Sequence, residues 1–236
     1  MKKLNKTTMH FVIIYALLVA CTAAIVMSFL LSPTTAKDIF RVHARTVVEV
    51  KVYNDVSNPA FGSAVAINRQ GLFITNAHVI AYRELIEYRA FENIWIRFAT
   101  DEHFVRAEFV NKDVALDLAT IQIDASNVNI RVANIRTSSV MEGERVYAIG
   151  NAQNHGVSML EGIVSKREVH IRADGRDIVA IQTSVMITNG NSGGALLDAN
   201  GNLVGITTFR LRDAANNTIY GISFAIPMSV VIEFVE

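Results

Sequence analysis

The chain has 236 residues, enough for one large domain or two small ones with a sizeable buried core. Its 22 basic and 22 acidic residues give a formal net charge of +0, so no bulk charge attracts nucleic acid or an acidic partner. A single cysteine, Cys21, excludes an intrachain disulfide, and the fold must therefore be held by packing.

The N-terminal segment is strongly hydrophobic and predicts a membrane anchor. Residues 1–10 are basic, and the uncharged apolar run at 11–31 follows them. As a helix, this run would be about 31 Å long, close to the thickness of a bilayer core. Lysines before the run favour a cytoplasmic N-terminus. We therefore expect a single-pass cell-membrane protein, with a linker at 32–37 and an extracytoplasmic domain at 38–236, which would be periplasmic in a Gram-negative cell.

Two other interpretations of this segment are open. Leu18 to Cys21 is similar to a bacterial lipoprotein signal, with Cys21 as the lipidated residue. Thr34 to Ala36 could end a cleaved signal peptide, although it is a poor cleavage site. The apolar run continues for ten positions past Cys21 and is longer than the apolar region of most signal peptides. The uncleaved anchor is therefore ranked first, the lipoprotein second and the cleaved signal third.

From residue 38 onward, short runs rich in Val and Ile alternate with turns rich in Gly, Asn and Asp. This pattern is typical of β-strands in an all-β barrel or sandwich. Only Tyr82 to Phe91 and Met228 to Val235 have a helical pattern. The predicted strands cover 47–52, 63–68, 72–75, 94–98, 105–110, 118–123, 145–149, 162–164, 178–183, 195–197, 203–208 and 221–226.

The strongest chemical signal is the segment Gly190-Asn191-Ser192-Gly193-Gly194. Glycines on both sides of a serine allow a sharp turn and a close approach of a substrate backbone. Ser192 could then act as a nucleophile, and the backbone N–H groups of Gly190 and Ser192 could form an oxyanion hole. On its own, the segment is also compatible with a glycine-rich hairpin.

A serine nucleophile needs a base, and the base needs an acid that orients it. His78 follows an apolar strand and begins a short turn, where a scaffold can present it to a cleft. Asp117 immediately precedes another apolar strand, which favours a partly buried carboxylate. Asp113, four residues earlier, competes for the same role on chemistry alone.

Several blocks in this order resemble the HtrA/Deg branch of the trypsin-like serine proteases. They are TNAHVI at 75–80, DLA at 117–119, YAIGN at 147–151, GIVS at 162–165, IQT at 181–183, GNSGGAL at 190–196 and GISFAIP at 221–227. The resemblance covers about residues 47–227 and makes Asp117, rather than Asp113, the catalytic acid. It implies an all-β, chymotrypsin-like fold of two antiparallel six-stranded barrels, at about 38–124 and 125–227, followed by a short C-terminal helix.

The resemblance also implies a function. The chain should be a serine endopeptidase with the triad His78, Asp117 and Ser192, no metal or organic cofactor, and envelope or misfolded polypeptides as substrates. It implies a homotrimer as well, and nothing in the residues points to nucleic acid. A catalytically dead scaffold and an esterase are the competing hypotheses. The complete triad argues against the scaffold, and the chymotrypsin-like order of the blocks argues against the esterase.

The chain departs from the family pattern at Ala152, where proline is usual, and at Ser184, where aspartate is usual, and further features bear on specificity and control. The chain ends about nine residues past Pro227, which leaves no room for the PDZ domain that the family usually carries. By register, Met186 is expected near the base of the P1 pocket and Ile222 on its wall, and no carboxylate falls there, which predicts aliphatic P1 residues. The residue before the nucleophile is Asn191, not the aspartate of digestive proteases, which predicts an oxyanion loop that forms without proteolytic activation. The edge of the strand at Thr208, Phe209 and Arg210 is expected to pair with the substrate.

Overall fold

The computed structural model of the protein describes residues 6–30, 34–85, 87–173, 176–212 and 218–236. The chain divides into two compact units, Met1–Thr34 and Thr35–Glu236. The first unit contains the helix α1 (Lys6–Leu30). Of the residues described, no helix is both long enough and apolar enough to cross a membrane. The last residue of the predicted anchor at 11–31 lies outside the described ranges, and the anchor stays a prediction from the sequence.

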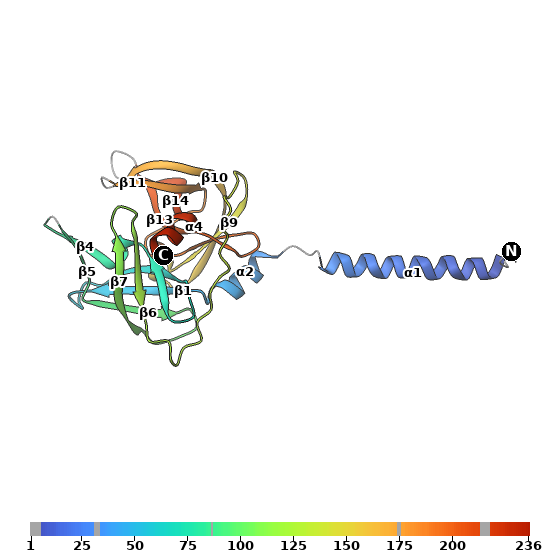
Figure 1. The fold of residues 1–236 in the computed structure, drawn as a ribbon, viewed down its shortest axis with the longest axis horizontal. Helices are drawn as coiled ribbons and strands as arrows, with labels where there is room; N and C mark the ends of the chain where they lie inside the picture. Colours follow the sequence, from blue (N-terminus) through green and yellow to red (C-terminus); the bar gives the residue numbers. More distant parts are fainter. Residues whose placement is uncertain (1–5, 31–33, 86, 174–175, 213–217) are drawn as a thin grey trace. The chain divides into compact units, whose positions relative to one another are not determined.

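The second unit is built from two closed antiparallel barrels of six strands each (Figure 1). This confirms the all-β, two-barrel fold expected from the sequence. The first barrel has the strand order β1 (Val47–Tyr53), β2 (Ala60–Ala66), β3 (Leu72–Thr75), β8 (Leu118–Gln122), β7 (Val105–Asp113) and β6 (Asn93–Phe98). The second has the order β10 (Ser158–Ala173), β11 (Arg176–Thr183), β14 (Thr218–Pro227), β13 (Leu203–Arg212), β12 (Ala195–Asp198) and β9 (Arg145–Gly150).

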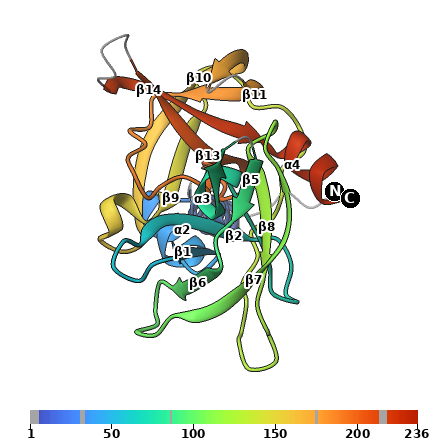
Figure 2. The same ribbon diagram turned by 90° about the vertical axis from the view of Figure 1, so that its left-hand side faces the viewer.

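The strands close into barrels because their apolar side chains alternate inward along the chain. Strand β6 shows this most plainly, since every second side chain from Ile94 to Phe98 is buried. Each barrel has its own core, and a further cluster joins them: Val47, Ile74 and Leu118 of the first barrel pack with Tyr147 and Ile149 of the second. Figures 1 and 2 show the blue-to-green first barrel next to the yellow-to-red second barrel.

The helical interpretation of Tyr82 to Phe91 is wrong. The segment forms a two-stranded hairpin, β4 (Ala81–Glu84) and β5 (Glu87–Ala90), in which Tyr82 pairs with Arg89. The rings of Tyr82 and Phe91 pack 5.1 Å apart, and Arg89 bridges to Glu84 at 2.8 Å. Such cross-strand pairs stabilise a hairpin as well as i,i+4 pairs stabilise a helix, so the residue types alone did not distinguish the two.

Short helices complete the second unit. The C-terminal helix α4 (Met228–Val235) is confirmed. An additional helix, α2 (Ala36–His43), begins inside the predicted linker because Thr35 and Asp38 form a capping box, and its Ile39 is fully buried in the core. Helix α3 (Ala77–Ile80) and the 3₁₀ turn η1 (Ala152–Asn154) lie at the site described next.

Candidate active site

His78 and Asp117 come together from two strands of the first barrel. His78 lies on α3, directly after β3, and Asp117 directly precedes β8, the strand that pairs with β3. His78 Nδ1 lies 2.9 Å from Asp117 Oδ2 and 3.0 Å from Oδ1. Because a carboxylate only accepts hydrogen bonds, Nδ1 carries the proton and leaves Nε2 as a base. The His78 side chain is 39% exposed and that of Asp117 is 0% exposed.

The Asp117 carboxylate is held on several sides. The His78 backbone N–H donates to Oδ1 at 3.2 Å, and the Thr208 hydroxyl, from β13 of the second barrel, donates to Oδ2 at 2.8 Å. The Asp117 backbone has a φ of 57°, and its carbonyl accepts bonds from Asn76 Nδ2 and the Ala77 N–H. Aspartate is one of the few residues that adopt this left-handed conformation readily. The local backbone therefore aims the carboxylate at His78.

Asp113 has a different role. It ends β7, and its Oδ1 accepts a 2.9 Å hydrogen bond from the Leu116 N–H. That bond closes the turn that leads to Asp117, as short acidic side chains commonly do. The geometry thus gives Asp113 a turn-forming role and brings Asp117 to the histidine.

The loop that carries Ser192 presents two backbone N–H groups. Asn191 N–H donates to the Thr188 carbonyl at 3.1 Å, and Gly190, the third residue of this turn, has a φ of 90°, as a type II turn requires. Within the described ranges, the N–H groups of Gly190 and Ser192 donate to no protein acceptor. They are therefore available for an oxyanion.

Asn191 supports this loop from inside the protein. The residue is 3% exposed, its side chain donates to Thr188 Oγ1 at 3.4 Å, and its carbonyl accepts a 2.6 Å bond from Thr207 Oγ1. These contacts come from the loop and from β13, with no chain terminus involved.

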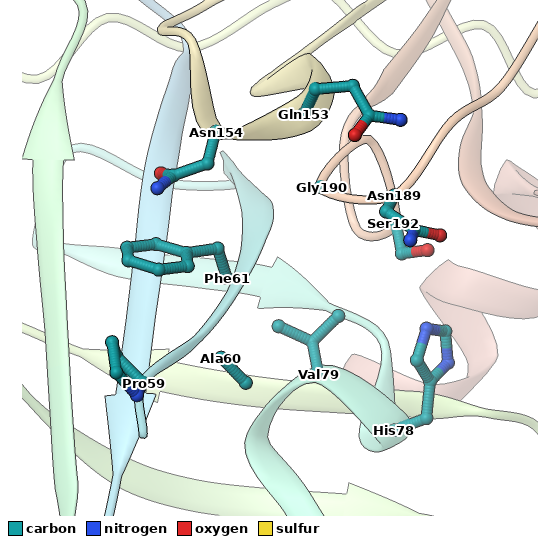
Figure 3. Close-up of a pocket in the computed structure, with 10 residues that line it drawn as sticks. All are labelled: Pro59, Ala60, Phe61, His78, Val79, Gln153, Asn154, Asn189, Gly190 and Ser192. Carbon is teal, nitrogen blue, oxygen red and sulfur yellow. The ribbon is translucent and has the colours of Figure 1, made fainter. Parts of the chain in front are cut away.

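The Ser192 hydroxyl is turned away from the base. It donates a 2.6 Å hydrogen bond to the Thr208 carbonyl. Among the hydrogen bonds of the described residues, none joins Ser192 to His78, although Figure 3 shows the two side chains facing the same hollow. Rotation about the Cα–Cβ bond of Ser192 separates this arrangement from one in which Oγ reaches Nε2.

Ser63, which the sequence analysis treated only as a strand residue, ties the first barrel to the Ser192 loop. Its fully buried hydroxyl donates to the Gly190 carbonyl at 2.7 Å and accepts from the Asn151 N–H at 2.8 Å. Its backbone N–H donates to the Ser192 carbonyl at 2.8 Å. A Cβ at Gly193 would collide with the Ser63 carbonyl, so this close approach also requires glycine. The sequence signal that could have pointed to this role of Ser63 was a small polar residue within the apolar strand β2.

We expect Ser63→Ala to lower kcat by about 10- to 100-fold with little change in KM, because the Gly190 carbonyl loses its donor and the oxyanion N–H groups lose their fixed direction. Leaving buried partners unsatisfied should also lower the free energy of unfolding by about 1–3 kcal/mol. Steady-state kinetics and urea denaturation measure the two effects. Thr46→Ala is the control, because it removes a buried hydroxyl that donates to the His43 carbonyl at 2.8 Å, far along the chain from the triad. Equal kcat values in both variants would contradict the positioning role.

Two hollows meet at Ser192 and His78. The first hollow has a volume of about 420 Å³ and is formed by residues of β2, α3, η1 and the Ser192 loop (Figure 3). The second hollow, of about 170 Å³, is bounded by the 187–189 segment on one side and by β13 on the other. It is lined by His78, Ile187, Thr188, Asn189, Ser192, Thr208, Phe209 and Arg210.

The second hollow brings together only part of the predicted specificity site. Thr208, Phe209 and Arg210 line it as expected. Met186 and Ile222 do not line either hollow, and Met186 is 50% exposed. The Ile187 N–H bonds back to the Val185 carbonyl, and this tight turn buries Val185 and Ile187 while directing Met186 outward. In the part of the chain that is described, no three His, Cys, Asp or Glu side chains could share a metal ion.

The sequence profile of the trypsin-like peptidase domain matches residues 62–206, more than half of the chain. The chain belongs to the trypsin-like peptidase family. A curated relative, the serine endoprotease DegS of Haemophilus influenzae, is 34% identical over 177 residues, which are 72% of this chain and 47% of that protein.

Solved structures of trypsin-like peptidases agree with this assignment. The serine endoprotease from Yersinia pestis superposes with a TM-score of 0.69 at 31% identity and covers 86% of this chain and 66% of its own. The HtrA-type protease AlgW, solved with a tripeptide, gives a TM-score of 0.71 at 28% identity, covering 85% of this chain and 62% of its own. The chain thus has HtrA- and DegS-type homologues and spans about half the length of the curated relatives it matches.

Proposed function

We propose that this peptidase domain is a serine endopeptidase that hydrolyses polypeptides through His78, Asp117 and Ser192. One observation carries the proposal: a buried Asp117 carboxylate holds His78 Nδ1 at 2.9 Å beside the loop that carries Ser192. The family profile and the endoprotease homologues support the same reaction.

In the proposed reaction, His78 Nε2 takes the Ser192 hydroxyl proton while Oγ bonds to the substrate carbonyl carbon. The resulting oxyanion accepts hydrogen bonds from the Gly190 and Ser192 N–H groups. The C–N bond then breaks, and the imidazolium delivers its proton to the departing amine. Water hydrolyses the acyl-enzyme by the same route, with His78 again as base. Asp117 keeps the correct tautomer and stabilises the imidazolium throughout.

Substrate binding would prepare the nucleophile. The Thr208 carbonyl accepts the Ser192 hydroxyl at 2.6 Å in the resting arrangement. A substrate strand that pairs with the β13 edge at Thr208–Arg210 would offer its own N–H to that carbonyl. This competition would release the hydroxyl to rotate toward His78, so the substrate backbone itself would favour the reactive geometry.

A fluorophosphonate probe tests the proposal directly, because it reacts with an activated serine before any substrate is known. We expect the probe to label Ser192, and the protein to degrade casein faster than a simple ester of comparable reactivity. Labelling without casein cleavage, together with rapid ester hydrolysis, would instead indicate an esterase. No labelling and no cleavage would indicate a scaffold without activity.

The anchor at 11–31, the extracytoplasmic location, envelope or misfolded polypeptides as substrates, and the homotrimer stay predictions from the sequence and its resemblance. The anchor can be tested alone by intact-mass spectrometry of the protein isolated from membranes. The expected mass includes residues 11–31 and no lipid. An N-terminus near Lys37, or a lipid on Cys21, would contradict the uncleaved anchor.

A further inference from the structure

Arg210 crosses the second hollow, the one that lies next to the nucleophile. It sits on β13, in register with Ser223 of β14. Its Nη1 donates to the Ile187 carbonyl at 3.4 Å and its Nη2 to Asn189 Oδ1 at 3.1 Å. These acceptors belong to the opposite wall, so the guanidinium spans the space that a substrate side chain would enter.

Among the described residues that line the two hollows, Arg210 carries the only permanent charge. Over the described ranges, no salt bridge involves Arg210. Arg97 and Arg136, in contrast, are each paired with a glutamate at 2.9 Å or less.

The hydrogen bonding of Arg210 is incomplete. A guanidinium has five N–H donors, and the two acceptors present are neutral, one of them at the long distance of 3.4 Å. Its Nε is buried and has no partner in the described part of the protein. A buried donor on a charged group that lacks an acceptor is costly, and an apolar substrate side chain would desolvate it further. A carboxylate would satisfy two of the donors in the fork geometry that arginine favours.

We propose that Arg210 binds a substrate carboxylate, so that the enzyme cleaves after aspartate or glutamate. The inference rests on the proposed endopeptidase function and names its substrate class. It replaces the aliphatic P1 residue expected from the sequence, because that expectation considered only the missing carboxylate at the pocket base and not the cation on β13. A lysine or arginine at P1 would meet the like charge of Arg210 and be excluded.

The test uses four peptides that differ only at P1, which is Glu, Gln, Leu or Lys. For the wild-type protein we expect kcat/KM for the Glu peptide to exceed that for the isosteric Gln peptide by at least about tenfold. Added salt should reduce this ratio, because part of the attraction is electrostatic and the hollow is open to solvent. In Arg210→Gln the ratio should fall to about one, and in Arg210→Glu the Lys peptide should become the best substrate.

Arg45→Gln is the matched control, because it removes an exposed arginine that lines neither hollow and should keep the wild-type Glu-to-Gln ratio. Thermal unfolding checks that the Arg210 variants fold. A wild-type preference for Leu, or a Glu preference that survives in Arg210→Gln, would overturn the proposal. Fluorophosphonate labelling of the wild-type protein separates the two ideas: labelling with an aliphatic preference rejects only the acidic specificity, whereas no labelling and no cleavage rejects both.

Discussion

Ser192→Ala should reduce peptide hydrolysis by at least about four orders of magnitude while leaving the fold intact. The substitution removes the only atom that can form the acyl-enzyme in the proposed reaction. The backbone N–H groups of residues 190 and 192 are unchanged and can still bind an oxyanion. Only weak hydrolysis by direct attack of water is therefore expected. The cost to folding is small, because the hydroxyl makes one hydrogen bond, to the Thr208 carbonyl, from a half-buried position.

Casein cleavage and fluorophosphonate labelling measure the chemical effect, and circular dichroism with thermal unfolding measures the fold. Ser158→Ala is the control, since Ser158 is a half-buried serine of the second barrel whose hydroxyl makes only a long, 3.5 Å contact to the Gly150 carbonyl. The control should cleave casein at the wild-type rate. A Ser192→Ala protein that still cleaves casein at a comparable rate would place the nucleophile elsewhere.

Asp117→Asn should lower kcat by about four orders of magnitude. The amide keeps the shape of the side chain but can turn an N–H toward His78. The imidazole would then carry its proton on Nε2 and could not accept the Ser192 proton. The charge that stabilises the imidazolium is lost as well. The Thr208 hydroxyl, which donates to Oδ2 at 2.8 Å, still has an oxygen within reach in one amide orientation, so the fold should survive.

Asp113→Asn is the matched comparison, with the same chemical change four residues earlier. Its Oδ1 accepts from the Leu116 N–H, a bond that an asparagine oxygen can also accept, so the effect on kcat should be less than about tenfold. Steady-state kinetics of both variants distinguish the roles, because only Asp117→Asn changes the carboxylate that holds His78 Nδ1 at 2.9 Å. A larger loss for Asp113→Asn than for Asp117→Asn would reverse the proposed choice of acid.

Local patterns were sufficient for much of the architecture. Short Val- and Ile-rich runs bounded by Gly, Asn and Asp turns predict strands because alternation and turn chemistry act within a few residues. The C-terminal helix was also predicted from a local pattern, and Met228 to Val235 forms the helix α4. The helix predicted at Tyr82 to Phe91 was wrong because the segment is stabilised as a hairpin by contacts across it, such as the 5.1 Å packing of Tyr82 on Phe91. The spacing of apolar residues along the sequence does not reveal such contacts.

The sequence by itself, through blocks that resemble the HtrA/Deg branch, determined the trypsin-like peptidase family and the three residues expected in the triad. The chemistry of the residue types alone left Asp113 and Asp117 both open as the acid. Only the tertiary structure decided what surrounds them. The Ser63 hydroxyl reaches Gly190 across 127 positions of the chain, and Arg210 crosses to Ile187 and Asn189. Met186 turns outward because its neighbours Val185 and Ile187 are the ones buried. Such contacts join distant segments, and they arise only when both barrels have closed and pack against each other.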